Sequence, residues 1–185
     1  MKEIDNILRI LRETKISIEK GDSNNIKQLS NQTIHSAAVY QDPDNVVVAV
    51  LVYSIGKILE REHYKEMDGW ADFYGLLMKH LDIAIKSLEV DNIEKFRLSM
   101  GKIRNSLNGA GNLKEYIKDV FRKAEINKAF KIYEHGLSSE QTATLLGVSL
   151  WDLSTYIGQS TIAEANVSET MPVKQRIKLA EDFFG

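Results

Sequence analysis

The feature of this chain that most constrains its fold is the near absence of residues that interrupt helices. Its 185 residues contain only two prolines, Pro43 and Pro172, and a proline inside a helix removes a backbone hydrogen bond and clashes with the preceding turn. Apolar residues recur every three or four positions, which is the period of an amphipathic helix. The clearest such run consists of Ile93, Phe96, Met100, Ile103 and Leu107. This alternating spacing is typical of a helix–helix seam, and the sequence therefore predicts an all-α fold.

Six helices are expected in the first part of the chain. Their approximate ranges are 4–18, 26–40, 46–59, 69–88, 93–107 and 112–134. The third begins VVVAVLVY and is rich in β-branched residues, which favour strands, but its length favours a helix and no second strand-like segment can pair with it. It is also too short to cross a bilayer, which takes roughly 20 apolar residues. We therefore expect it to be the buried central helix of an α-helical bundle that spans residues 1–135.

Polar residues at the expected helix starts indicate where the helices begin. Either Asp42 or Asp44 can cap the helix that starts around Pro43, a residue tolerated in a first helical turn. Asp91 and Glu94 resemble a capping box at the start of the fifth helix.

The segment 137–157 meets several requirements of a helix-turn-helix unit at once. Ser138 and Gln141 form a capping-box pair that opens a short helix. Ala143 lies four residues before Gly147. A helix-turn-helix needs a small residue where its two helices approach closely, and it favours glycine at the turn because the backbone there is left-handed.

A second short helix is expected to follow that turn. Ser149 and Asp152 are placed to cap it, and Leu153, Tyr156 and Ile157 recur on its inward face. The sequence thus predicts a helix-turn-helix-like module with a terminal helix over residues 136–185.

The charge of this module bears on what it binds. The whole chain has a formal net charge of −2, and residues 136–173 contain no lysine or arginine but four acidic residues, Glu140, Asp152, Glu164 and Glu169. Phosphate contacts supply nearly all non-specific DNA affinity and need cations or backbone amides. Cations could come only from neighbouring helices, namely Lys118, Arg122, Lys123, Lys128, Lys131, Lys174, Arg176 and Lys178. We therefore favour a protein partner over DNA, and expect DNA binding to be weak.

The string IYEHGLSSEQTATLLGVSLWDLSTYIG, residues 132–158, resembles the small prokaryotic helix-turn-helix antitoxin-like proteins that are often encoded beside PIN-domain toxins. The shared features are a small residue at Ala143, glycine at Gly147, a cap at Ser149 and an aromatic residue at Trp151. The resemblance implies a role in neutralising a toxin by binding it. The candidate contact residues for a protein partner or DNA in this helix are Ser149, Trp151, Asp152, Ser154 and Thr155.

A second resemblance lies in the predicted bundle. The stretch Ser30-Asn31-Gln32-Thr33-Ile34-His35 resembles the motif of HEPN-type ribonucleases, which are helical bundles. That motif opens with an arginine, and this sequence has Ser30 there. We therefore expect no catalytic residues and no enzymatic activity, with His35 bonded to a neighbour in its helix. The chain contains no cysteine, its four histidines form no ligand pair, and neither a metal nor a cofactor is expected.

The last residues predict a further helix. Val173, Ile177, Ala180 and Phe184 form one apolar stripe with Phe183 beside it, after a polar connection over residues 159–171. Such a short helix must be docked to be ordered, either on its own bundle or on another chain. The candidate partner-binding residues here are Ile177, Phe183 and Phe184.

These features together favour a non-enzymatic, antitoxin-like regulatory protein that binds a protein partner, either a PIN-type toxin or a second copy of itself as a homodimer. A DNA-binding transcriptional regulator is one alternative, and a HEPN-like ribonuclease or its inactive relative is another. No signal peptide or membrane segment is apparent at the N-terminus, and the lack of cysteine suits a reducing compartment, so a cytoplasmic location is expected.

Overall fold

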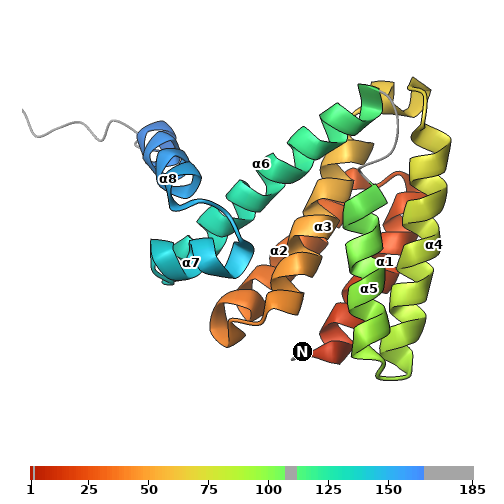
Figure 1. Cartoon of the computed structure of the whole chain (residues 1–185), viewed down its shortest axis with the longest axis horizontal. Helices are drawn as coiled ribbons and strands as arrows, with labels where there is room; N and C mark the ends of the chain where they lie inside the picture. Colours follow the sequence, from red (N-terminus) through yellow and green to blue (C-terminus); the bar gives the residue numbers. More distant parts are fainter. Residues whose placement is uncertain (2, 107–111, 165–185) are drawn as a thin grey trace, which may run out of the picture.

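The computed structural model describes residues 1, 3–106 and 112–164, with side chains at all of them except 35, 112 and 159–164. These residues form α-helices, one short 3-10 helix (η1) and no strand, which confirms the all-α prediction (Figure 1). The elements are α1 (Ile4–Lys20), α2 (Ser23–Tyr40), α3 (Pro43–Leu59), η1 (Glu62–Glu66), α4 (Trp70–Glu89), α5 (Ile93–Ser106), α6 (Asn112–Glu134), α7 (Ser139–Leu146) and α8 (Leu150–Glu164).

Helices α1 to α5 form a bundle in which α3 is the central element. The pairs α2–α3 and α4–α5 pack as neighbours, and α3 also contacts α1, α5, α6 and α7. Nearly every residue of α3 from Asp44 to Leu59 is buried. A helix that is apolar on all sides is stable only inside a core, so the prediction of a buried central helix is confirmed.

The start of α3 follows the polar signal of the sequence, and the start of α5 does not. Asp42 is the residue that caps α3, since its side chain accepts a hydrogen bond from the Asp44 amide at 3.0 Å. The predicted capping box at the start of α5 is wrong. Asn92 supplies the cap instead, because its Oδ1 accepts from the Lys95 amide at 2.9 Å, while Asp91 takes a left-handed conformation with a φ of 53°.

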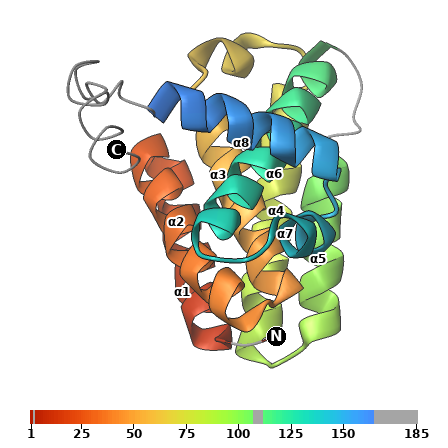
Figure 2. The ribbon, with the colours of Figure 1, turned by 90° about the vertical axis from the view of Figure 1, so that its left-hand side faces the viewer.

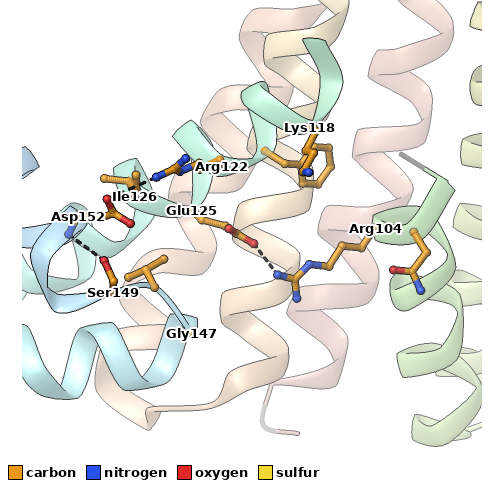
Figure 3. Close-up of a pocket in the computed structure, with 11 residues that line it drawn as sticks. Arg104, Lys118, Arg122, Glu125, Ile126, Gly147, Ser149 and Asp152 are labelled. Atoms are coloured by element: carbon orange, nitrogen blue, oxygen red, sulfur yellow. Dashed lines mark hydrogen bonds and ion pairs between the residues drawn. The ribbon is translucent and has the colours of Figure 1, made fainter. Parts of the chain in front are cut away.

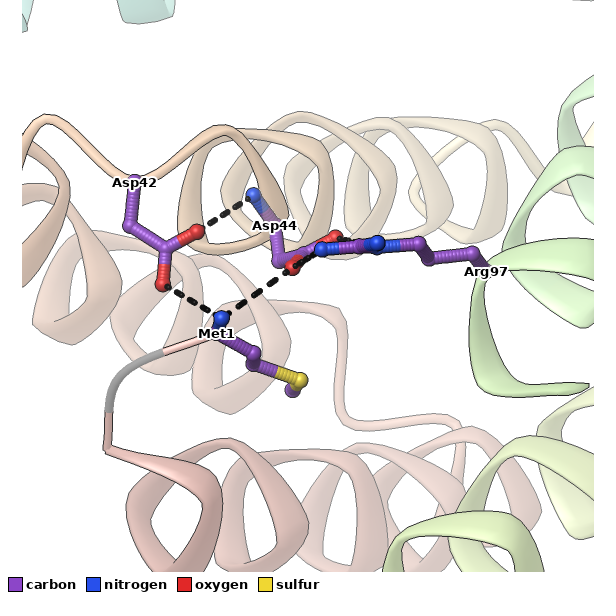
Figure 4. A network of polar contacts seen from close by, with 4 residues as sticks. All are labelled: Met1, Asp42, Asp44 and Arg97. Atoms are coloured by element: carbon purple, nitrogen blue, oxygen red, sulfur yellow. Dashed lines mark hydrogen bonds and ion pairs between the residues drawn. The ribbon is translucent and has the colours of Figure 1, made fainter. Parts of the chain in front are cut away.

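An ionic network around the buried carboxylates of Asp42 and Asp44 ties α3 to α5 (Figure 4). Arg97 of α5 donates two hydrogen bonds to the carboxylate of Asp44, at 2.9 and 2.8 Å. The Met1 ammonium lies 4.0 Å from a carboxylate oxygen of Asp42 and 3.9 Å from one of Asp44. Buried carboxylates need such partners because an unpaired buried charge is costly. The two cations therefore hold the start of α3 in place.

Helix α6 crosses the bundle and carries α7 and α8 at its far end (Figures 1 and 2). Its first half contributes Leu113, Ile117, Val120 and Phe121 to the main core, and its second half contributes Ala129 to a small separate cluster with Ala143 and Leu153. Because α6 packs against both parts, the division of the chain near residue 135 stays a prediction.

Helix α8 is longer than the sequence predicts. It continues to Glu164, whereas a polar connection was expected from residue 159. The reason for the error is that residues 159–164 lack apolar periodicity, and a helix can nonetheless continue through polar residues from a well-anchored first half. None of the helices in the described ranges is long and apolar enough to span a membrane.

Candidate functional site

Helices α7 and α8, which the sequence predicts to form a helix-turn-helix unit, are joined by a tight turn at Gly147. The predicted capping box is present, with Ser138 Oγ accepting from the Gln141 amide and Gln141 Oε1 accepting from the Ser138 amide, both at 3.1 Å. Gly147 ends α7 with a φ of 67°, and the Val148 amide donates to the Ala143 carbonyl at 3.1 Å. This left-handed turn explains the glycine.

The small residues of the unit permit close packing. Ala143 of α7 is buried against Ala129 of α6 and Leu153 of α8. On the same side, Tyr156 of α8 faces α6, where its hydroxyl accepts from Asn127 Nδ2 at 3.1 Å and its ring meets the edge of Phe130. These contacts hold the inner face of α8 and leave its opposite face free of the bundle.

The outer face of α8 carries the residues that the sequence singled out. Trp151 is 79% exposed and the adjacent Leu150 is 45% exposed, and both Ser154 and Thr155 are exposed. Two large apolar side chains thus protrude from the first turn of the helix that would be the recognition helix of a DNA-binding unit. Neither α7 nor α8 contains a lysine or an arginine.

Ser149 and Asp152 have structural contacts at the start of α8. Ser149 Oγ accepts from the Asp152 amide at 3.0 Å, as an N-cap does. The Asp152 carboxylate accepts from Arg122 of α6 at 3.5 Å. Both residues therefore face the bundle side of the turn, away from the exposed surface of Trp151.

A cleft of about 440 Å³ lies between α5, α6 and the α7–α8 turn (Figure 3). Three cations line it, Arg104 of α5 and Lys118 and Arg122 of α6, together with the carboxylates of Glu125 and Asp152. Arg104 pairs with Glu125 at 2.7 Å. The sequence placed Lys118 and Arg122 on α6 as available cations but did not identify Arg104, because nothing in the local pattern shows which face of α5 meets α6.

Lys128 occupies a different environment from the other α6 cations. It is 1% exposed, its Nζ donates to Asn31 Oδ1 at 2.8 Å, and the Nζ lies 4.1 Å from the centroid of the Tyr53 ring. Burial, helped by the nearby positive charge of Lys131, lowers the pKa of Lys128 to about 8. Lys128 was expected among the cations available to DNA, and this expectation is wrong because the side chain is buried between α2, α3 and α6.

This contact brings a cation to the segment that resembles the HEPN motif. Ser30, which stands at the position of the motif's arginine, is buried and donates to the Ala49 carbonyl at 2.7 Å. Lys128 supplies a positive charge to the neighbouring Asn31, but from inside the bundle. A side chain with this burial cannot reach an RNA phosphate without a rearrangement, so the contact is explained by packing between α2 and α6.

The remaining predicted site residues lie outside the described structure. Ile177, Phe183 and Phe184 belong to residues 165–185, and the side chain of His35 is likewise outside the description. Among the residues that the structure does describe, no group of three or more histidine, aspartate or glutamate side chains could hold a metal ion.

Comparison of the chain with protein-family models, with curated proteins and with solved structures found no match. The two resemblances drawn from the sequence therefore stay predictions.

Proposed function

We propose that this protein is a non-enzymatic, antitoxin-like regulator that binds a protein partner through the outer face of α8. The observation that carries the proposal is the 79% exposure of Trp151 on the first turn of that helix. Contiguous exposed apolar surface marks interaction sites, and tryptophan is enriched among the residues that dominate binding energy at protein interfaces.

The surroundings of Trp151 fit a protein interface better than a DNA interface. Leu150 extends the apolar surface, while Ser154 and Thr155 provide polar groups one turn further along. An interface typically combines an aromatic or aliphatic anchor with a polar rim. A DNA-binding surface instead needs cations that face the phosphates, and the cations nearest to α8 line the cleft on its bundle side.

A direct binding assay with a PIN-domain toxin as the partner tests the proposal. Burying an anchor such as Trp151 is typically worth about 2 kcal/mol or more in affinity, so Trp151→Ala should weaken binding by roughly 30-fold. The matched control is Leu98→Ala, because Leu98 is also an exposed apolar residue, at 68%, but lies on α5. Equal affinities of the Trp151 variant and the wild type would exclude this face as the interface.

Other protein partners are tested by quantitative affinity purification with the same variants. A partner that uses the outer face of α8 should be depleted with Trp151→Ala and retained with Leu98→Ala. Self-association through the same face would appear in sedimentation velocity as a dimer that dissociates in Trp151→Ala alone. If every partner and every assembly is retained in both variants, the proposal is wrong.

A DNA-binding regulator is the second candidate, and one observation favours it. Arg122 reaches Asp152 at the start of α8, so cations of α6 do lie beside the helix-turn-helix unit, as such a regulator requires. The long distance of 3.5 Å leaves the guanidinium able to exchange Asp152 for a phosphate. Loss of DNA affinity in Arg122→Gln, with no effect of Trp151→Ala, would favour this candidate over a protein partner.

A further inference from the structure

A second cavity adjoins the cleft beside the helix-turn-helix unit. This second cavity, of about 280 Å³, lies between α3, α5, α6 and α7, and it shares Arg104, Phe121, Glu125 and Gly147 with the cationic cleft. The two cavities therefore adjoin beside the α7–α8 turn, and we refer to the pair as one space. Sites for small molecules occur preferentially at such junctions between structural units.

The inner wall of this space is mostly apolar, with Arg104, Glu125 and Thr144 as its polar members. Its apolar part is formed by aliphatic and aromatic side chains from the start of α3, the middle of α6 and the end of α7, namely Val46, Val47, Val50, Leu51, Phe121, Leu145 and Leu146. Burial of a hydrocarbon or ring system against such a wall is favourable because apolar surface leaves water.

The mouth of the space is cationic. Its three cations exceed its two carboxylates by one charge. Lys118 pairs with no carboxylate in the part of the chain that the structure describes, and Arg122 reaches Asp152 only at 3.5 Å. Two of the three cations can thus bind an added anionic group without giving up a strong ion pair (Figure 3). Arg104, held at 2.7 Å by Glu125, forms the boundary between the mouth and the apolar cavity.

We propose that this space binds an amphipathic anion, a small molecule with an apolar body that enters between α3 and α7 and a terminal carboxylate or phosphate that meets Lys118 and Arg122. An apolar wall ending in a few convergent polar groups is the usual composition of a small-molecule site. The excess positive charge selects an anionic end over a neutral or cationic one, since charge-assisted hydrogen bonds are the strong ones. An extended nucleic acid does not fit, because its sugar–phosphate backbone has no large apolar group to bury against the apolar inner wall.

Isothermal titration calorimetry on the full chain tests the proposal with octanoate and octyl phosphate as probes. Octanol and octyltrimethylammonium are the controls for the anionic end. We expect both anions to bind at least tenfold more tightly than either control, and the comparison of the two anions shows which terminal group is preferred. Binding of octanol as tight as that of octanoate, or no binding of either anion, would overturn the proposal.

Two variants locate the site. Lys118→Gln removes the unpaired cation and should weaken the binding of octanoate and octyl phosphate by roughly tenfold. Lys95→Gln changes an exposed lysine on α5 outside the cleft and should leave both affinities unchanged. Val47→Phe fills the apolar cavity from its partly buried wall and should abolish binding of both anions. Circular dichroism and thermal unfolding of each variant establish that it is folded, and a folded Lys118→Gln that binds like the wild type refutes the assignment.

Because probe binding is measured on the purified chain alone, its outcome is independent of whether Trp151 contacts a partner. Gly147 and Ser149, which line the cleft, belong to the turn that sets the position of α8. A molecule bound in the cleft would therefore contact the turn that positions the helix that carries Trp151.

Discussion

Replacing Lys128 with methionine should make the protein more stable at neutral pH. The ammonium of Lys128 is 1% exposed and has no carboxylate among its described contacts. Its pKa falls from the ordinary value of 10.5 to about 8 because of burial first and Lys131 second. At about 1.4 kcal/mol for each tenfold change in proton affinity, keeping this charge inside the bundle costs about 3 kcal/mol. Methionine has a similar length, is apolar and fills irregular gaps.

The gain is smaller than this cost, because two contacts are lost with the charge. The hydrogen bond to Asn31 and the interaction with the Tyr53 ring together contribute about 1–2 kcal/mol, and Asn31 is exposed, so its amide can bind water instead. The net expectation for Lys128→Met at pH 7 is therefore an increase of about 1–2 kcal/mol in the free energy of unfolding.

The pH dependence provides a sharper test than the stability at one pH. Between pH 8 and 10.5 the unfolded chain keeps a proton on Lys128 that the folded protein has lost, so the stability of the wild type rises with pH through this window. Below pH 8 Lys128 is protonated in both the folded and the unfolded protein, so the full cost of burying its charge is present. The methionine variant lacks this titration, so its stability relative to the wild type should fall by about 2–3 kcal/mol between pH 7 and pH 10, and its advantage of about 1–2 kcal/mol should disappear or reverse.

Urea unfolding of both proteins at a series of pH values from 7 to 10 measures this difference, in which the titration of all other groups cancels. Lys123→Met is the control, because Lys123 lies on the same helix but its side chain is 71% exposed, and its replacement should change stability by less than about 0.5 kcal/mol at any pH. A difference between wild type and Lys128→Met that is the same at pH 7 and pH 10 would refute the reasoning.

Three further predictions concern the site. The protein should not cleave RNA, since Ser30 stands where the HEPN motif has arginine and Lys128 is buried; cleavage that His35→Ala abolishes would contradict this. Duplex DNA should bind weakly at physiological salt in fluorescence anisotropy, because α7 and α8 carry no lysine or arginine; a specific site with nanomolar affinity would show the charge argument to be wrong. Ser138→Ala should lower the free energy of unfolding of the α7–α8 unit by about 1 kcal/mol through loss of its cap, and an unchanged value would mean that the capping box contributes nothing.

The helices could be predicted because each has a local signal. Asp42 before Pro43 defines the start of α3, and Gly147 with its left-handed backbone defines the end of α7. The burial of α3 also follows from its composition, since a helix with apolar residues on every side has no face suited to water.

Less of the candidate site could be predicted from the sequence, because the site depends on which helices pack against each other. Trp151 was identified as a contact residue from its place in the helix-turn-helix pattern, but its exposure could not be distinguished from core packing. The burial of Lys128 had no local signal at all: lysine is almost never buried, and only the crossing of α6 over α2 and α3 encloses it. Arg104 and Lys118 are 14 positions apart on different helices, and only the packing of α5 near α6 brings them to one cleft.

The small cluster formed by Ala129, Ala143 and Leu153 has a consequence for how the protein opens. In the described part of the chain, few buried apolar side chains hold α7 and α8 to α6, namely these three residues and Phe130, whereas the bundle has a large continuous core. Regions with few buried contacts unfold locally at a fraction of the global free energy. In native-state hydrogen exchange, the amides of α7 and α8 should therefore exchange as one unit well before those of α3. A ligand that binds only the closed form of this unit should therefore lower the population of the locally unfolded form and slow the exchange of these amides.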